Sequence, residues 1–170
     1  MRRHEDGNSI VTHEFDAFYD KNSRVLILGT IPSPKSREQG FYYGHPQNRF
    51  WRVLADVMEA EFPETVEERK RFLTHHRIAL WDVLASCEIK GASDVSIRNA
   101  EPNDMNRILK AADIRAIFTT GAKATELYKK LCMPKCGVKA VRLPSTSPAN
   151  CSCTYEKLRE AYSQICDYVK

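Results

Sequence analysis

Aromatic, imidazole and amide groups gather in the segment FYYGHPQNRFW. Tyr42, Tyr43 and His45 precede a helical pattern, and an exposed aromatic ring outside a helix can stack on a nucleic-acid base. The proline between them and the amides is a helix-start signal, so we predict that Gln47 and Asn48 lie in the first helical turn. There they would face the mouth of a pocket and be available for hydrogen bonds to a ligand.

Two proline-stiffened loops carry small hydroxyl side chains that could hold phosphate. Hydroxyls and backbone N–H groups fixed at helix N-termini bind phosphodiester oxygens without reading base sequence. The same residues could instead serve only as turns and helix caps. Nearby charged side chains, Lys35, Arg37 and Arg49, could meet phosphates or simply be solvated. The loop residues are Thr30, Pro32, Ser33, Pro34 and Ser36 in the first loop, and Pro144, Ser145, Thr146, Ser147 and Pro148 in the second.

Strand and helix patterns alternate along the chain, which predicts how these loops are positioned. Short apolar runs typical of buried strands begin near residues 24, 77, 114 and 138, and amphipathic helical patterns lie between them. Right-handed crossovers place helices on both faces of such a sheet. We therefore predict an α/β protein, a three-layer α/β/α sandwich with a central, mainly parallel four-stranded sheet.

The carboxyl ends of parallel strands share one rim, where ligands bind. Three connections should meet there, and we expect all three to be loops. They are residues 29–48, 85–104 and 143–152. The first is long for a loop in a compact domain, and such loops are usually functional or disordered.

Composition indicates one globular domain, residues 1–170. The hydrophobic content is 42%, and the net charge of +4 permits contact with a polyanion without requiring it. The N-terminus lacks the apolar stretch of a signal peptide, and no apolar run reaches the length of a membrane span. We expect a cytoplasmic protein without membrane contact, and a monomer by default.

Six cysteines raise the question of metal binding. Cys132, Cys136, Cys151 and Cys153 could in principle supply four thiolates, but their spacing matches no standard zinc or iron–sulfur knuckle. Reduced, scattered thiols are the favoured interpretation, with no metal and no cofactor. The usual nucleotide and hydrolase fingerprints, G-x-x-x-x-G-K, G-x-G-x-x-G and G-x-S-x-G, are absent as well.

Taken together, LILGTIPSPKSREQGFYYGHPQNRFW and LPSTSPAN resemble the uracil-DNA glycosylase superfamily, most closely its hypoxanthine-DNA glycosylase branch. The likeness covers most of the chain. In the mismatch-directed branch, an Asn after the first strand orients the attacking water, and Ile31 takes that position here. The hypoxanthine branch resembles this sequence in lacking that Asn and relying on the Asn of His-Pro-x-Asn, which implies that Asn48 positions the water.

The resemblance also implies roles for the other segments. Tyr43 would lie against a flipped base, and His45 would either donate a proton to the leaving purine or serve as a cap. LPSTSPAN would grip the backbone of double-stranded DNA containing a deaminated base. The implied base-binding residues are Tyr43, Gly29, Thr30, His45 and Gln47, and the implied DNA-binding residues are Ser33, Ser36, Pro144, Ser145, Thr146, Ser147 and Pro148.

The implied activity is that of a monofunctional glycosylase, which hydrolyses the N-glycosidic bond of deoxyinosine without a Schiff base. Three alternatives stay open at this point. The main substrate could be uracil or another deaminated base, the chain could be an inactive DNA-binding relative, or it could bind a small nucleotide. Excision of a base from a duplex distinguishes the first of these from the other two.

Overall fold

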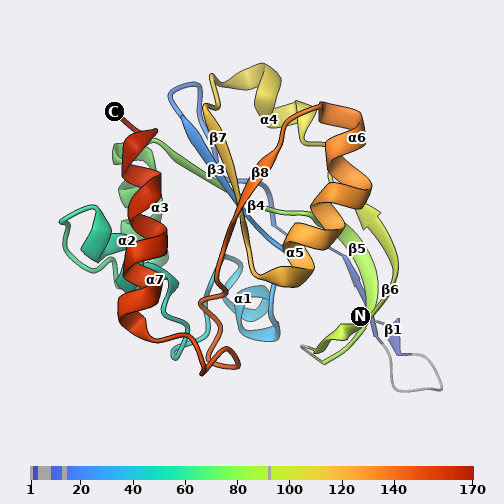
Figure 1. Cartoon of the computed structure of the whole chain (residues 1–170). Coiled ribbons are helices and arrows are strands. Elements are labelled where there is room, and N and C mark those ends of the chain that lie inside the picture. The colour runs from blue at the N-terminus through green and yellow to red at the C-terminus, as the bar shows by residue number, and fades with distance from the viewer. Residues whose placement is uncertain (1, 4–8, 13–14, 92) are drawn as a thin grey trace.

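A four-stranded parallel sheet forms the centre of the computed structural model, which describes residues 2–3, 9–12, 15–91 and 93–170 (Figure 1). Its strand order is β4-β3-β7-β8, and every neighbouring pair is parallel. The predicted sheet is confirmed. The strands are β3 (Val25–Gly29), β4 (Ile78–Asp82), β7 (Ala116–Thr120) and β8 (Ala140–Leu143).

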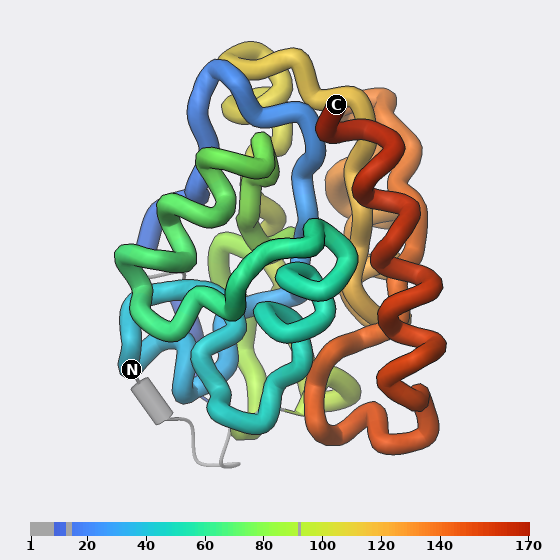
Figure 2. Tube along the Cα trace, turned by 90° about the vertical axis from the view of Figure 1, so that its left-hand side faces the viewer, coloured from blue at the N-terminus to red at the C-terminus, as the bar shows by residue number. Residues whose placement is uncertain are grey.

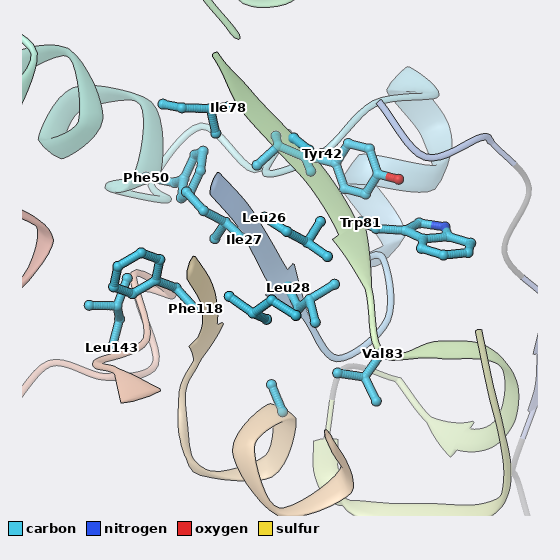
Figure 3. Close-up of a cluster of buried hydrophobic side chains, with 14 of the residues drawn as sticks. Leu26, Ile27, Leu28, Tyr42, Phe50, Ile78, Trp81, Val83, Phe118 and Leu143 are labelled. Atoms are coloured by element: carbon cyan, nitrogen blue, oxygen red, sulfur yellow. The ribbon is translucent and has the colours of Figure 1, made fainter. Parts of the chain in front are cut away.

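The central strands form where the sequence is apolar without interruption. Every residue of β3 and β4 is buried, as expected for strands covered on both faces. Figure 3 shows Leu26, Ile27 and Leu28 of β3 within the buried cluster, near side chains from β4, β7 and α2. This core fixes the carboxyl end of β3, which ends at Gly29.

Helices cover both faces of this sheet, which confirms the three-layer sandwich. Figure 1 shows α2, α3 and α7 on one side and α5 and α6 on the other, and Figure 2 shows α7 beside α2. No helix within the described residues is long and apolar enough to cross a membrane. The helices are α1 (Pro34–Gln39), α2 (Phe50–Val57), α3 (Val66–His75), α4 (Asn106–Ala111), α5 (Ala122–Leu127), α6 (Met133–Cys136) and α7 (Tyr155–Tyr162), with a π-helical turn η1 (Tyr128–Cys132) and a 3₁₀ turn η2 (Ser163–Asp167).

A second, antiparallel sheet was not predicted. It has the order β1-β2-β5-β6 and uses much of the segment 85–104 that the sequence suggested was a loop. That prediction is wrong because β6 is mostly exposed and shows no apolar alternation, so pairing with β5 holds it in place. The strands are β1 (Arg2–Arg3), β2 (Ser9–Thr12), β5 (Leu84–Lys90) and β6 (Ser93–Pro102).

A single residue, Val83, separates the end of β4 from the start of β5, where the chain passes from the parallel to the antiparallel sheet. Its N–H donates to Gly29 O at 2.8 Å, and the Leu84 N–H donates to Thr30 O at 3.1 Å. These bonds continue the pairing of β3 and β4 beyond the parallel sheet. The β5–β6 hairpin therefore leaves the sheet at the rim where the strands end.

Candidate nucleic-acid and base-binding site

A cavity of about 180 Å³ opens at the carboxyl ends of β3, β4 and β7. Both long loops that the sequence singled out contribute to its wall. The cavity thus lies where ligands bind in parallel α/β folds. The lining residues are Gly29, Thr30, Ile31, Pro32, Ser33, Pro34, Ser36, Tyr42, Tyr43, Asn48, Asp82, Ile89, Gly91, Asp94, Thr120, Ser145, Thr146 and Ser147.

Hydrogen bonds within the first loop hold it together. Ser33 caps α1 by accepting from the Ser36 N–H at 3.2 Å. The buried Ser36 Oγ accepts from the Gly44 N–H at 3.0 Å and from the Ser33 hydroxyl at 3.1 Å. Gln39 Nε2 donates to Gly44 O at 3.0 Å, so both backbone groups of Gly44 are bonded inside the loop. These hydrogen bonds close the loop on itself, and Tyr42 and Tyr43 add bonds from their hydroxyls to Asp16 O and Thr120 Oγ1.

Tyr43 forms an aromatic platform in the cavity wall. Its ring stacks on Phe50, with centroids 3.8 Å apart and an interplanar angle of 12°. Phe50 covers one face of the ring, and Tyr43 is half-buried and lines the cavity. The backbone of Tyr43 has φ of 53°, and such strain in a non-glycine residue is found preferentially at functional sites.

The Tyr43 hydroxyl is fixed at the floor of the cavity. It lies 3.4 Å from Thr120 Oγ1, which itself donates to Leu28 O at 3.2 Å. Since the single hydroxyl proton of Thr120 is used in this way, Tyr43 is the donor of the pair. Burial and, second, the Asp82 carboxyl raise the pKa of Tyr43, so the side chain stays a neutral phenol.

Asp82 places a buried carboxyl group in the cavity, next to this platform. The residue ends β4, is 4% exposed, and its backbone oxygen accepts from Asn103 Nδ2 at 2.9 Å. A Cβ on Gly29 would lie 2.6 Å from Asp82 Oδ1 and 3.4 Å from the Tyr43 hydroxyl. Glycine at position 29 therefore allows the carboxyl and the phenol to converge on the end of β3.

Asn48 lines the cavity at the entrance to α2. Its Oδ1 accepts from the Phe50 N–H at 2.9 Å, and its own N–H donates to His45 O at 2.9 Å. The predicted start of the helix near Pro46 is wrong by several residues, because these bonds form a turn and α2 begins at Phe50. The hydrogen bond from the Phe50 N–H fixes the plane of the Asn48 amide and leaves Oδ1 able to accept one further hydrogen bond.

His45 and Gln47 lie outside the lining of the cavity. His45 Nδ1 accepts from the Gln47 N–H at 3.1 Å, so this nitrogen carries no proton in the turn. Gln47 is exposed to solvent. The structure thus gives His45 a local role in shaping the turn before Asn48.

The second loop carries its hydroxyls on compact turns. Ser145 Oγ accepts from the Ser147 N–H at 3.2 Å, and Asn150 Nδ2 donates to Ser145 O at 3.0 Å. Thr146 is buried, whereas Ser145 and Ser147 are half-buried and line the cavity. Pro144 and Pro148 flank this stretch without lining the cavity.

Arg49 joins the two loops, which lie side by side in both Figure 1 and Figure 2. Its backbone N–H donates to Thr146 O at 3.1 Å. The guanidinium donates to Cys153 O at 2.7 Å, to Asn150 O at 3.0 Å and to Ser147 O at 3.4 Å. These contacts give Arg49 a structural use that the sequence did not reveal.

The β5–β6 hairpin supplies a third wall. Ile89 is buried against the cavity, and Gly91 and Asp94 line it near the turn. Segment 85–104 does reach the predicted rim, but as paired strands. Ala92, within that segment, lies outside the described residues.

Sequence reasoning missed Asp82, and it considered Arg49 only as a possible phosphate contact or a solvated charge. Asp82 was recognisable in principle, since a carboxylate directly follows the apolar run IALW at the end of a buried strand. The bonds of Arg49 could not be found in this way, because its partners are backbone carbonyls about a hundred residues away in the sequence.

The cysteines form no metal centre within the described part of the chain. All six are free thiols, and the described residues contain no group of three or more His, Cys, Asp or Glu that could hold an ion. Burial raises the pKa of Cys132 to about 11, which leaves it a thiol at neutral pH.

The fold and the site together define a class of protein. A parallel α/β/α sandwich holds, at its strand ends, a cavity with a stacking aromatic, a carboxyl and an amide, next to a hydroxyl-bearing loop. A cavity of this kind can accommodate a single base. The chain belongs to the uracil DNA glycosylase superfamily, whose family model matches residues 17–169.

Individual relatives agree with this assignment. A protein named hypoxanthine DNA glycosylase from Methanosarcina acetivorans is 35% identical over 143 residues, which is 83% of this chain and 89% of the relative. One of the same name from Methanosarcina barkeri is 32% identical over 139 residues, or 80% and 86% of the two chains. The resemblance seen in the sequence is confirmed.

A solved structure supports the fold. It is a solution NMR structure from Methanosarcina acetivorans, assigned provisionally to uracil DNA glycosylases, and the TM-score is 0.80 at 32% identity. The match covers 94% of this chain and 98% of the other.

Proposed function

We propose that this protein is a monofunctional glycosylase that flips deoxyinosine out of double-stranded DNA and hydrolyses its N-glycosidic bond. Hypoxanthine is released and an abasic site is left for base excision repair. The protein acts as a monomer on duplex DNA that contains a deaminated base. The names of the two Methanosarcina relatives support this substrate.

The observation that carries the proposal is the buried Asp82 carboxyl beside the Tyr43 platform. In this proposal the carboxyl oxygens of Asp82 accept a hydrogen bond from the flipped base. Hypoxanthine presents a ring N1–H donor, whereas N1 of adenine is an acceptor that would face the carboxylate unpaired. Such a site rejects the undamaged base because burying unpaired polar groups is costly.

Stacking contributes to holding the flipped base. Extruding a base costs a few kcal/mol and is cheapest when the base is mispaired. Stacking on an aromatic ring returns about 1–3 kcal/mol per base, so Tyr43 offsets much of this cost. Guanine also carries a ring N–H, but its stable pair with cytosine makes extrusion more expensive. Gly29 and Thr30 would meet the base at the cavity floor.

Asn48 is the residue we assign to the attacking water. Ile31 lines the cavity as an apolar side chain and cannot orient water. The free acceptor site on Asn48 Oδ1 can, while its bond from the Phe50 N–H holds the amide still. An amide removes no proton, so the barrier falls mainly by stabilisation of an oxocarbenium-like sugar and the departing purine by fixed dipoles.

Phosphate contacts would come from both rim loops. Ser33, Ser145 and Ser147 are half-buried at the cavity and combine hydroxyls with nearby backbone N–H groups. Ser36 and Thr146 are buried, and the hydroxyl of Ser36 is engaged within its loop. We therefore assign those two residues to supporting the loops. Pro144 and Pro148 stiffen the second loop.

The test is an excision assay on labelled duplexes that carry deoxyinosine, deoxyuridine or deoxyadenosine at one position, with and without alkali. We expect product from the inosine duplex only after alkali, and none from adenine. Product from uracil alone would move the specificity to another branch of the superfamily. Strand cleavage before alkali would contradict a monofunctional mechanism, and release of no base would contradict the proposal.

A further inference from the structure

The Arg49 guanidinium donates its hydrogen bonds to backbone carbonyl groups. The side chain is half-buried, and its guanidinium reaches three carbonyl oxygens of the second loop, those of Ser147, Asn150 and Cys153. Within the described residues, no salt bridge joins it to a carboxylate. A basic residue at the rim of a DNA-binding cavity is therefore committed to shaping a loop.

The same residue is tied to the reaction centre through its own backbone. It directly follows Asn48, and its N–H donates to Thr146 O. The N–H of the next residue, Phe50, donates to Asn48 Oδ1, and the Phe50 ring stacks on the ring of Tyr43. Arg49 thus contacts the second loop through both its main chain and its side chain. It does so next to Asn48, the proposed water-orienting residue, and close to the ring of Tyr43.

We propose that Arg49 is a positioning residue that binds no phosphate itself. It fixes the position of the second loop, residues 144–153, relative to Asn48 and Tyr43. The planar guanidinium suits this role because its fork of donors can serve several carbonyls at once. When the loop is held in this position, a DNA strand bound at Ser145 and Ser147 presents its flipped nucleotide to Asn48. The consequence for excision rests on the proposed function, whereas the consequence for loop order does not.

The competing assignment is a direct phosphate contact, and salt dependence separates the two. Each phosphate neutralised by a cation contributes about −0.9 to the slope of log affinity against log salt concentration. A positioning residue leaves this slope unchanged. A lysine in its place keeps the charge and could still meet a phosphate, but it cannot serve three carbonyls in a fixed fork.

The experiment compares the full-length wild type with Arg49→Gln and Arg49→Lys. The matched control is Arg71→Gln, which removes the same charge from an exposed arginine in the last turns of α3, next to the amino end of β4. Three quantities are measured for each protein. They are amide hydrogen exchange, the salt dependence of binding to an inosine duplex, and the single-turnover rate of excision.

We expect both Arg49 variants to exchange amides at 144–153 faster while 33–44 stays protected, and to excise at least about tenfold more slowly with an unchanged salt slope. Arg71→Gln should behave as wild type. A slope that becomes shallower by about 0.9 in Arg49→Gln, with activity restored by Arg49→Lys, would overturn the proposal. Unchanged exchange in the loop would overturn it as well.

The two proposals fail separately. If wild-type protein releases no base from any duplex, the proposed function is wrong, while exchange at 144–153 still decides whether Arg49 orders the loop. If Arg49→Gln does not fold, Arg49→Lys still separates the two assignments: a positioning role predicts faster exchange at 144–153 and slower excision, whereas a phosphate contact predicts both unchanged.

Discussion

The two loops that meet at the cavity are held by different kinds of contact. In the first, Ser33, Ser36, Gln39 and Gly44 bond to one another, and the loop closes on itself. The second has turns of its own, but the contacts that bind it to the rest of the protein come from Arg49 and from Tyr162, whose hydroxyl donates to Pro144 O at 2.9 Å.

This difference agrees with the different roles that we propose for the two loops. Tyr43 and Asn48, which we propose to act at the flipped base and the attacking water, belong to the first loop. Groups suited to phosphate, such as Ser145 and Ser147, belong to the loop that depends on its neighbours. Precise placement matters most where bonds are made and broken, because small displacements there lower the rate steeply.

The largest expected effect is on chemistry at the first segment. We predict that Asn48→Ala lowers single-turnover excision of hypoxanthine by about 10²- to 10³-fold, because the water loses its acceptor. Duplex affinity should stay nearly unchanged, and loss of the hydrogen bond from the Phe50 N–H should cost about 1 kcal/mol of unfolding free energy. Asn48→Asp keeps an acceptor for the Phe50 N–H and serves as the control. Comparable excision by Asn48→Ala would remove this residue from the mechanism.

A pair of substitutions, one in each loop, compares their contributions to the unfolding free energy. Ser36→Ala leaves the Gly44 N–H without its partner, and we predict a loss of about 1–3 kcal/mol in unfolding free energy. Ser145→Ala removes a half-buried hydroxyl and should cost less than about 1 kcal/mol. Denaturant unfolding measures both. Equal losses would contradict the difference between the two loops.

A smaller effect is expected from the outer support of the second loop. Tyr162→Phe removes the hydrogen bond to Pro144 O and should cost about 0.5–1.5 kcal/mol. Hydrogen exchange should rise at 144–153 and stay constant at 33–44. Tyr168→Phe, which removes the hydroxyl of a more exposed tyrosine, is the control. Faster exchange in both loops would contradict their independence.

The smallest effect concerns alkaline pH. Burial raises the pKa of Tyr43 and Tyr162, so the folded protein keeps phenol protons that the unfolded chain loses above about pH 10. Unfolding free energy is therefore unaffected below that pH and falls as the pH rises beyond it. Tyr43→Phe should make this fall shallower. Unfolding midpoints measured from about pH 9 to pH 11 test this, and an unchanged pH dependence would contradict it.

Sequence patterns were sufficient for the parallel sheet but not for the antiparallel one. Continuous apolar runs, such as VLILG in β3, admit few interpretations other than a buried strand. The hairpin of β5 and β6 combines exposed positions with register shifts, so its strands carry no clear period. Its pairing with β2 depends on residues distant in the chain.

The site was predictable to the extent that its groups belong to motifs. Tyr43 and Asn48 lie in one quoted segment, and both line the cavity. His45 and Gln47 lie in the same segment but outside the cavity lining, because the turn before α2 uses His45 Nδ1 locally. Spacing alone cannot show which members of a motif face inward.

The central claim is that the Asp82 carboxyl selects a base with a ring N–H. Its most direct test is the ratio of single-turnover excision rates for inosine and adenine in one duplex context, compared between wild type and Asp82→Asn. An amide offers an N–H to adenine N1, so we predict that this ratio falls at least about tenfold in the variant. A uniform loss of rate on both bases, with the ratio unchanged, would contradict the claim.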